Sequence, residues 1–305
     1  MTKKAIGNMA ASVRDQLKAM SRTKGRPFAD LLLYFAIERL LYRLSKSKHA
    51  DEFVLKGALM LQYWGLELSR ATRDIDLLGR ATVSVERMLI VFREIVRVRV
   101  EDDGLRFESE SVAAGEIRTV QKYQGVRVSM TVFLGNARIP LQVDVGFGDV
   151  VTPKARRVVV RSLLGFDGAK LFGTTPETAI AEKVQSMIAL DMANSRMKDF
   201  YDVWMLSKTR QFSGRTLSRA IRATFKRRDT PLPDENPRVF MEAFYANDTK
   251  QVQYRAFLKK SAASDTTVNL EAVVKDISAF LMPVFQSLID KEQFEGDWPP
   301  GGPWR

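Results

Sequence analysis

The sequence of 305 residues contains no cysteine and only one histidine, His49. Without cysteine the chain forms neither disulfides nor thiolate metal sites, and it has no thiol nucleophile, as is usual in a reducing compartment. A single histidine excludes zinc sites built from several histidines. Aspartate and glutamate remain as the candidate general bases. His49 itself, in the polar run KSKHADE, is expected to be a solvated loop residue.

Long hydrophobic segments are scarce as well. The first residues, MTKKAIGNMAAS, lack the continuous apolar core of a signal peptide. The uncharged apolar run 31–37 is much shorter than the roughly 20 residues that a membrane span needs. We therefore expect a cytoplasmic protein with no membrane partner.

Positive charge is in excess. The chain has 48 Lys and Arg residues against 36 Asp and Glu residues, a formal charge of +12 and a pI near 9.9. Lys and Arg on a surface attract phosphate backbones, so the composition favours a polyanionic partner such as nucleic acid. Basic proteins without such partners are also common, and charge alone leaves both readings open.

The segment 52–79 contains the main candidate site. It predicts a short strand, a turn at residues 56–58, a short helix and a second strand that includes Asp74 and Asp76. Alternate side chains of a strand share a face, so these two carboxylates point the same way. Facing carboxylates are costly to ionise together unless a cation lies between them, and they suit Mg²⁺ or Mn²⁺. The simpler alternative is a strand with an acidic solvent-facing side.

Gly57 stands at the predicted strand-to-helix turn. Because glycine has no side chain, phosphate oxygens can approach backbone N–H groups there. Lys56 and Ala58 flank Gly57 in this turn, and Arg70, Thr72 and Arg73 add donors for phosphate or nucleotide just upstream of the carboxylates.

The pattern of the remaining N-terminal half predicts a mixed α+β domain. Apolar residues at helical spacing predict helices over 8–23, 28–44 and 85–96. Alternating residues predict antiparallel strands around 105–107, 126–132 and 139–145, with turns at Gly125 and Gly135-Asn136. Asp144 lies opposite the apolar face of the last strand, which predicts a third carboxylate from a neighbouring strand.

The C-terminal half reads as almost entirely helical from Thr175 onward. Pro153 and the basic residues after it mark the change, and Thr175-Pro176-Glu177 is a typical helix start. We predict N-terminal helices over 1–50, a mixed-sheet domain over 51–160 and a helical domain over 161–305. The tail, 295–305, is expected to be a packed or loose extension.

A second candidate cluster lies in the helical half. Lys183 is suited to meet a triphosphate as a flexible point charge. Asp199 and Asp202 are three residues apart on one helical face and are suited to orient Lys183 or Arg196. The alternative is ordinary pairing within one helix, for example Lys198 with Asp202, which stabilises a helix by only a few tenths of a kcal/mol.

One predicted helix has a cationic stripe. The stripe residues are spaced four, three and four apart, and apolar residues occupy the opposite side. The stripe is a candidate to follow an RNA backbone, but it contains no aromatic residue to stack on bases, so a solvated face is the alternative. Its members are Arg215, Arg219, Arg222 and Lys226.

Two motifs resemble those of a known family. The run LKGA followed by R-x-T-x-D-I-D-L, and the later segment R-x-K-D-x-x-D, are similar to motifs of the AbiEii/AbiGii abortive-infection toxins and the related MenT toxins, which belong to the nucleotidyltransferase superfamily. The family usually has Lys-Gly-Gly at positions 56–58, so Ala58 replaces the second glycine here. It usually has Leu at the position of Val203. The resemblance implies a DNA polymerase β-like nucleotidyltransferase domain, followed by a helical domain that closes the cleft, with the Lys at position 183 early in its helix.

The resemblance also implies a mechanism. Asp74 and Asp76 would hold two Mg²⁺ ions that bridge a nucleoside triphosphate, Asp144 would bind the second metal and help to deprotonate the attacking hydroxyl, and Lys56, Arg70 or Lys183 would neutralise the triphosphate. The remaining family positions, Arg196, Lys198, Asp199 and Asp202, would lie against the nucleotide.

The expected biological role is that of the toxin of a type IV abortive-infection pair active in phage defence. Such a toxin would transfer a nucleotide to RNA, with the 3′ end of tRNA as the expected acceptor, and an AbiEi-like antitoxin would be encoded nearby. The main alternative is a non-catalytic protein on the same fold that binds nucleotide or RNA. A metal-dependent phosphohydrolase is a weaker alternative.

Overall fold

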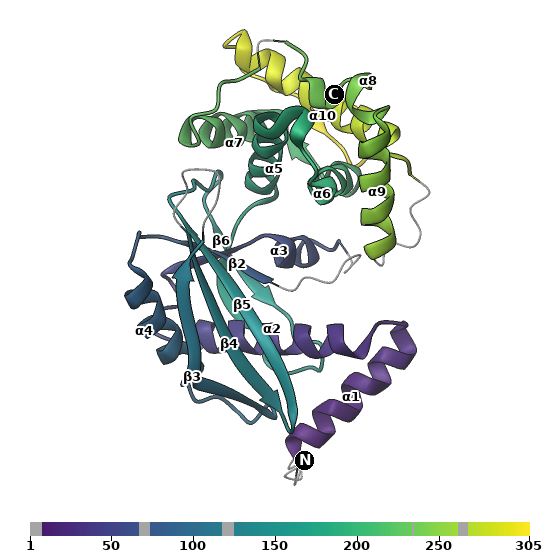
Figure 1. Cartoon of the computed structure of the whole chain (residues 1–305). Helices are drawn as coiled ribbons and strands as arrows, with labels where there is room; N and C mark the ends of the chain where they lie inside the picture. Colours follow the sequence, from purple (N-terminus) through teal and green to yellow (C-terminus); the bar gives the residue numbers. More distant parts are fainter. Residues whose placement is uncertain (1–7, 67–73, 118–124, 234, 262–267) are drawn as a thin grey trace. The chain divides into compact units, whose positions relative to one another are not determined.

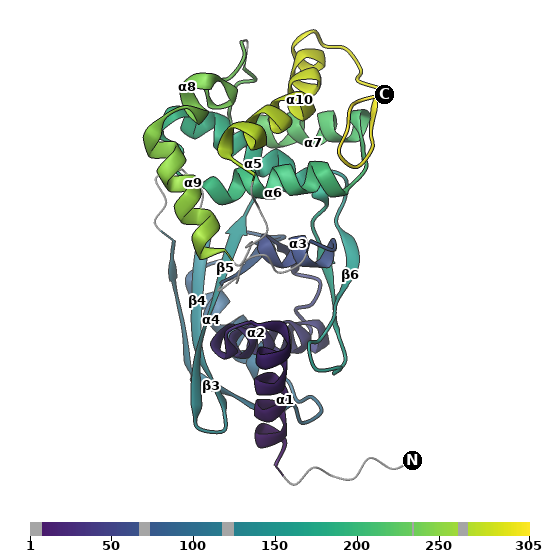
Figure 2. The ribbon, with the colours of Figure 1, turned by 90° about the vertical axis from the view of Figure 1, so that its right-hand side faces the viewer.

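The computed structural model describes residues 8–66, 74–117, 125–233, 235–261 and 268–305. The chain divides into two compact units. We call them the sheet unit, which comprises the described parts of 1–63, 72–148 and 156–173, and the helical unit, which comprises those of 64–71, 149–155 and 174–305. The helices of the first 50 residues therefore belong with the sheet (Figures 1 and 2).

A seven-stranded mixed sheet is the centre of the sheet unit, with the strand order β3-β4-β5-β2-β1-β7-β6 (Figure 1). Strand β2 pairs parallel to β5 and β1 pairs parallel to β7, whereas the other neighbours are antiparallel. The strands are β1 Phe53–Lys56, β2 Asp74–Gly79, β3 Leu105–Glu116, β4 Gly125–Leu134, β5 Ala137–Phe147, β6 Arg156–Val160 and β7 Ala169–Gly173.

In the described part of the unit, this sheet is accompanied by the helices α1 Met9–Lys24, α2 Phe28–Lys46, α3 Ala58–Tyr63 and α4 Val85–Val96. The helices predicted over 8–23, 28–44 and 85–96 are thus confirmed, as are the strands around Asp74, 126–132 and 139–145. Strands β6 and β7 were not predicted: β6 falls at the end of the predicted mixed-sheet domain, 51–160, and β7 falls in the region that had been assigned to the helical domain. The fold is the predicted mixed sheet flanked by helices.

The core of the sheet unit lies on one face of the sheet. Helix α2 packs against β5 and β7, α4 packs against β3 and β4, and the two helices also contact each other. The apolar residues of β4 and β5 that alternate toward these helices are buried, for example Val128, Val132 and Val143. The polar residues between them, among them Arg127 and Asp144, therefore lie on the opposite face.

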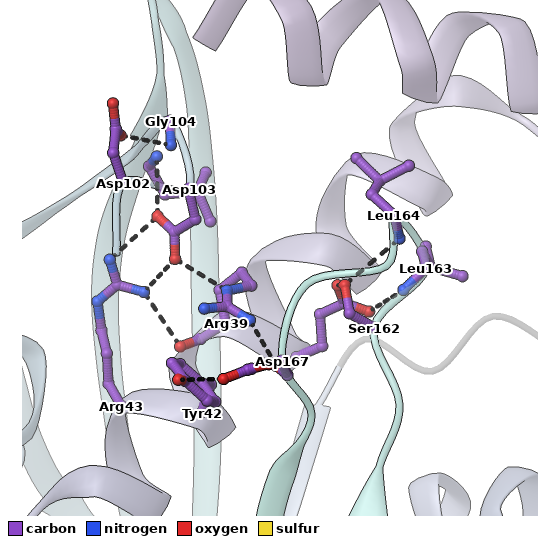
Figure 3. Close-up of polar contacts among 12 residues, drawn as sticks. Arg39, Tyr42, Arg43, Asp102, Asp103, Gly104, Ser162, Leu163, Leu164 and Asp167 are labelled. Atoms are coloured by element: carbon purple, nitrogen blue, oxygen red, sulfur yellow. Dashed lines mark hydrogen bonds and ion pairs between the residues drawn. The ribbon is translucent and has the colours of Figure 1, made fainter. Parts of the chain in front are cut away.

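Buried charges tie α2 to two loops of the sheet unit. Arg39 and Arg43 both hydrogen-bond to the carboxylate of Asp103, with Nε of Arg39 at 2.9 Å and Nη1 of Arg43 at 2.7 Å from Oδ2 (Figure 3). Arg39 also donates to the backbone oxygen of Asp167, at 2.9 Å, in the loop between β6 and β7. Burial works against the charge of Asp103, but the two guanidinium groups outweigh it and lower its pKa.

Glu38 is the second buried acid of α2. The hydroxyl of Ser162 and the N–H of Leu163, which lie side by side in Figure 3, hydrogen-bond to its two carboxyl oxygens. Burial raises the pKa of Glu38 to about 7, and these two hydrogen bonds offset only part of that effect.

We expect Glu38 to make the free energy of unfolding fall as the pH rises from about 4.5 to about 7. In that range the folded chain holds a proton that the unfolded chain has released, and the whole difference corresponds to on the order of 3 kcal/mol. The free energy of unfolding, measured in urea, should fall less between pH 5 and pH 8 for Glu38→Gln than for the wild type. Equal losses in the two proteins would contradict the raised pKa.

His49 lies in the predicted loop, but the prediction that it is solvated is wrong. Its side chain is 1% exposed rather than solvated, and its Nδ1 and Nε2 atoms lie 2.6 Å from carboxylate oxygens of Glu52 and Glu94. Glu52 is close in sequence, but Glu94 comes from α4, so the packing of α4 beside the end of α2 buries the ring. A polar local sequence gave no sign of this contact.

Among its described residues, the helical unit contains the longer helices α5 Pro176–Leu190, α6 Met197–Thr209, α7 Gly214–Arg227, α9 Asp248–Lys260 and α10 Leu270–Ile289. Shorter elements complete it: η1 Asp191–Ala193, η2 Arg238–Phe240, α8 Glu242–Tyr245, and the strand pair β8 Phe212–Ser213 and β9 Asp297–Trp298. Helix α10 is long and apolar enough, by length and composition, to cross a membrane. Because half of that stretch is buried and the helix packs against α6 and α7, we interpret it as the core helix of this unit.

The C-terminal tail is packed. The indole N–H groups of Trp298 and Trp304 donate to the backbone oxygens of Ser207 and Phe280, at 2.8 and 2.9 Å. The ring of Phe280 stacks on that of Trp304, with centroids 5.6 Å apart. Of the two alternatives that the sequence left open for the tail, the structure shows the packed one.

Candidate active site

A row of four charged residues crosses the middle of the sheet. Lys56 on β1 is paired with Asp76 on β2, Asp76 with Asp144 on β5, and Asp144 with Arg127 on β4. Residues directly opposite one another in a ladder project from the same face, so the row presents two carboxylates flanked by two cations. Asp74, two residues before Asp76 on the same face, adds a third carboxylate. The prediction that Asp144 comes from a strand beside Asp74 and Asp76 is confirmed.

The backbone conformation and the close approach of Asp76 both favour glycine at position 57. Its φ angle is +72°, a conformation that residues with a side chain rarely adopt. A Cβ atom at this position would meet the carboxylate of Asp76, at 2.8 Å from its Cγ and 2.9 Å from its Cβ, and still closer to Oδ2. The absent side chain therefore makes the room that the carboxylate of Asp76 occupies.

We expect Gly57→Ala to cost about 1–3 kcal/mol of stability through backbone strain and to lower activity about 100-fold by displacing Asp76. Gly135→Ala is the matched control, since Gly135 also has a positive φ, +57°, but open space around its Cα. The control should show the strain and keep the activity. Thermal unfolding and a transfer assay on both variants measure the two effects, and equal activities would contradict the close contact.

Arg127 was not among the predicted site residues. Its Nε and Nη2 atoms donate to Oδ1 and Oδ2 of Asp144 at 2.9 and 2.8 Å, which is a bidentate ion pair. The hydrogen bonds from Arg127 to Asp144, together with the charges of Asp144 and Asp74, raise the pKa of the guanidinium. The sequence contained the signal, because a two-residue turn at Gly135-Asn136 fixes a register that sets position 127 opposite position 144.

The donor chemistry of the row suits a hard divalent cation only in part. Asp74 and Asp76 supply carboxylate oxygens from one face of one strand, as Mg²⁺ and Mn²⁺ prefer. Asp144 is instead engaged at both oxygens by Arg127. Within the residues that the structure describes, no group of three acidic, histidine or cysteine side chains is arranged to hold a metal ion. Arg127 therefore competes with a metal ion for the carboxylate of Asp144.

The predicted cluster of the helical unit does come together. Nζ of Lys183 on α5 lies 2.9 Å from Oδ1 of Asp199 and 2.8 Å from Oδ2 of Asp202, both on α6. Nε of Arg196, just before α6, lies 2.7 Å from Oδ2 of Asp199. The two carboxylates thus bind a cation on another helix, as the first of the two predictions stated. Lys183 lies in the middle of α5 and not early in it, as had been expected.

Burial and ion pairing act in opposite directions on Lys183 and Asp199. Burial works against the charge of Lys183, but Asp199 and Asp202 outweigh it and raise the pKa of the ammonium. Asp199 is also opposed by burial, and Lys183 and Arg196 lower its pKa. Lys183 is therefore a permanent point charge held by two buried acids, and it is unsuited to act as a base.

The other predicted site residues have different places. Arg70, Thr72 and Arg73 lie outside the described residues. Ala58 is the first residue of α3, and Lys198 is exposed in the first turn of α6. The four stripe residues Arg215, Arg219, Arg222 and Lys226 are exposed on α7, opposite the buried Leu217, Ile221 and Phe225.

The chain is similar to one protein family and to solved structures from one organism. A family model described as the nucleotidyl transferase AbiEii toxin of type IV toxin–antitoxin systems matches residues 39–288. JHP933 from Helicobacter pylori is 13% identical over 83% of this chain and 90% of its own, with a TM-score of 0.46. A candidate nucleotidyltransferase from H. pylori has the same identity and TM-score and is covered to 94%. No curated protein matches the sequence.

The family model includes both motif regions, the charged row of the sheet unit and the Lys183 cluster of the helical unit. It spans most of the chain. The protein therefore belongs to the AbiEii family of nucleotidyltransferase toxins of type IV toxin–antitoxin systems.

Proposed function

We propose that this nucleotidyltransferase toxin moves a nucleoside monophosphate from a triphosphate to the 3′ end of tRNA, with Mg²⁺ or Mn²⁺ as cofactor. In this reaction the acceptor 3′ oxygen bonds to the α-phosphorus, and the bond to pyrophosphate breaks, so that pyrophosphate leaves with the bonding electrons. The hydroxyl proton passes to a base. The single observation that favours a nucleic-acid acceptor is the exposed cationic stripe of α7 on a chain with a net charge of +12.

The charged row supplies the groups for the transfer step. Asp74 and Asp76 would hold the divalent cation, which when bound offsets the charge that develops on the phosphate oxygens. Asp144 would accept the proton of the attacking hydroxyl. Lys56, at the end of the row, and the turn at Gly57 would bind the triphosphate.

Lys183 would act in the same reaction as a fixed positive charge for the triphosphate. Asp199 and Asp202 hold its Nζ atom by two hydrogen bonds, so its position does not have to be organised when the substrate binds. Arg196 and Lys198, next to these acids in sequence, are the further candidates for nucleotide contact.

The α7 stripe supports RNA as the acceptor because most of its charge is uncompensated. Arg215 pairs with Glu295 at 2.7 Å, and both side chains are exposed. Among the described residues, Arg219, Arg222 and Lys226 have no ion-pair partner. They follow one line along the helix, at a spacing that suits successive phosphates of a backbone.

The test is to incubate the protein with bulk tRNA, Mg²⁺ and each radiolabelled triphosphate in turn, and to locate any label by nuclease digestion. We expect label at the 3′ end. Replacement of Arg219, Arg222 and Lys226 by serine should raise the apparent KM for tRNA and should reduce the slope of log K against log salt by about two, because up to three phosphate contacts are lost. Replacement of Arg255, Lys259 and Lys260 on α9 is the charge-matched control.

Three results would count against parts of the proposal. If the label appears on protein and not on RNA, the acceptor is a protein and not tRNA. If only free phosphate or monophosphate is released, the phosphohydrolase alternative is favoured. If the α9 control weakened tRNA binding as much as the α7 variant, total charge and not the stripe would be responsible.

Family membership implies a cognate antitoxin. We propose that it is AbiEi-like and encoded nearby, and that the toxin arrests growth in the bacterial cytoplasm as a defence against phage. Expression of the toxin without its partner should stop growth, and co-expression of the neighbouring gene should restore it. Growth arrest that persists in a transfer-deficient variant would instead favour the binding-only alternative.

A further inference from the structure

The ion pair between Arg127 and Asp144 joins a site residue to a group that has no assigned role. The guanidinium contacts both carboxylate oxygens, at 2.9 and 2.8 Å, and Gln142 also lies 3.4 Å from Oδ1 of Asp144. The pair stands beside Asp76 in the charged row, and Arg127 also interacts electrostatically with Asp74. Arg127 is thus the cation that neutralises this end of the row.

The pair is poorly explained as a stabilising contact. Strands β4 and β5 are already joined by a continuous ladder from Gly125 and Gly146 to the turn. The side chain of Arg127 is 49% exposed and that of Asp144 is 21% exposed. Ion pairs that open to solvent contribute little to stability, because water screens the charges and both side chains lose freedom.

The same exposure lets the pair separate. Arg127 is long and half-exposed, so rotation about its side-chain bonds removes it from Asp144 without a change in the backbone. Asp144 is short and stays in the row. Two positive groups cannot occupy the same carboxylate at low cost, so binding of a divalent cation at Asp144 and departure of Arg127 are coupled. A phosphate held by a cation at Asp144 would lie within reach of the released guanidinium, whose planar fork suits phosphate oxygens.

We propose that Arg127 is a phosphate-binding residue of the transfer reaction, which neutralises Asp144 in the substrate-free enzyme and exchanges Asp144 for a substrate phosphate when a divalent cation binds to the row. This inference rests on the metal-dependent transfer proposed above. The phosphate belongs either to the triphosphate or to the acceptor, and the kinetic measurements below separate the two.

The first test does not depend on activity. Mn²⁺ binding to the nucleotide-free protein is followed by electron paramagnetic resonance for the wild type, Arg127→Gln, Asp144→Asn and the control Arg138→Gln. Arg138 is an exposed cation on the same face of β5, near the start of the strand. Because Mn²⁺ no longer competes with the guanidinium, Arg127→Gln should bind Mn²⁺ about two- to fivefold more tightly than the wild type. Asp144→Asn should bind it more weakly, and Arg138→Gln should be unchanged.

Unchanged or weaker Mn²⁺ binding in Arg127→Gln would overturn the exchange, as would an equal gain in Arg138→Gln. The absence of Mn²⁺ binding by the wild type would also overturn it. These outcomes are independent of whether the protein labels tRNA, so failure of the proposed acceptor and failure of this inference are distinguishable.

The second test locates the phosphate. Arg127→Gln should raise the KM for one substrate roughly tenfold, since a charged hydrogen-bonding group is lost. A higher KM for the triphosphate assigns the contact to the nucleotide, and a higher KM for the RNA assigns it to the acceptor. Arg127→Lys keeps the charge but not the planar fork, so its KM should lie between those of the wild type and Arg127→Gln. If neither KM changes in Arg127→Gln, Arg127 is only the partner of Asp144 and the proposal is wrong.

Discussion

Replacement of Asp76 by alanine should abolish nucleotide transfer and leave the fold intact. Asp76 occupies the centre of the charged row, opposite both Lys56 and Asp144, and Gly57 leaves the space for its carboxylate. Without it the row loses a ligand for the divalent cation that the transfer would use. In the metal-free protein, removal of one carboxylate also relieves repulsion from Asp74 and Asp144, which offsets the lost contacts of Asp76.

The measurement is the rate of label transfer from a triphosphate, together with the urea midpoint of unfolding. We expect a loss of at least about a thousandfold in rate, comparable with other losses of a principal charge-stabilising group, and the same result for Asp74→Ala. Glu101→Ala, which removes an exposed carboxylate of the same unit, is the control. Near wild-type transfer by Asp76→Ala would remove the row from the active site.

Replacement of Lys183 by methionine should lower the free energy of unfolding and also reduce nucleotide transfer. The side chains of Asp199 and Asp202 are 1% and 4% exposed, and Lys183 is their shared cation. Breaking a buried ion pair by removing one partner typically costs 3–5 kcal/mol. We expect about 3 kcal/mol here, because Arg196 still pairs with Asp199.

The loss of stability and the loss of function can be separated. A triple variant with Lys183→Met, Asp199→Asn and Asp202→Asn has no unpaired buried charge, so its free energy of unfolding should recover while transfer stays absent. Lys183→Arg should fold but transfer poorly, because a planar fork does not reproduce a compact ammonium between two separate carboxylates. If the triple variant regained transfer, Lys183 would serve only the fold.

Much of the candidate site follows from local sequence rules. Strand alternation places Asp74 and Asp76 on one face, and Ile75 and Leu77 are buried on the other. Helical periodicity places Asp199 and Asp202 together on α6. The turn at residues 135 and 136 also determines that Arg127 faces Asp144, although this pair was not read from the sequence. In each case the contact depends on the repeat of a single element or on one tight turn.

Other features depend on which distant segments pair. The parallel pairing of β2 with β5 puts Asp144 next to Asp76, and the pairing of β1 with β7 adds strands that the sequence analysis missed. The pairing of Lys183 with Asp202 depends on the packing of α5 against α6. The burial of His49 depends on Glu94 from α4.

Residue spacing within one element was enough to predict the faces on which the carboxylates lie, the two nucleotidyltransferase motifs and the cationic stripe of α7, and one tight turn sets Arg127 opposite Asp144. The packing of elements against one another then selected the partners of the buried polar groups: Lys183 between two buried acids, and His49 between two glutamates. Charge pairing in a folded protein is set by distances between elements, and a polar side chain has the same appearance in a sequence whether it meets water or a buried partner.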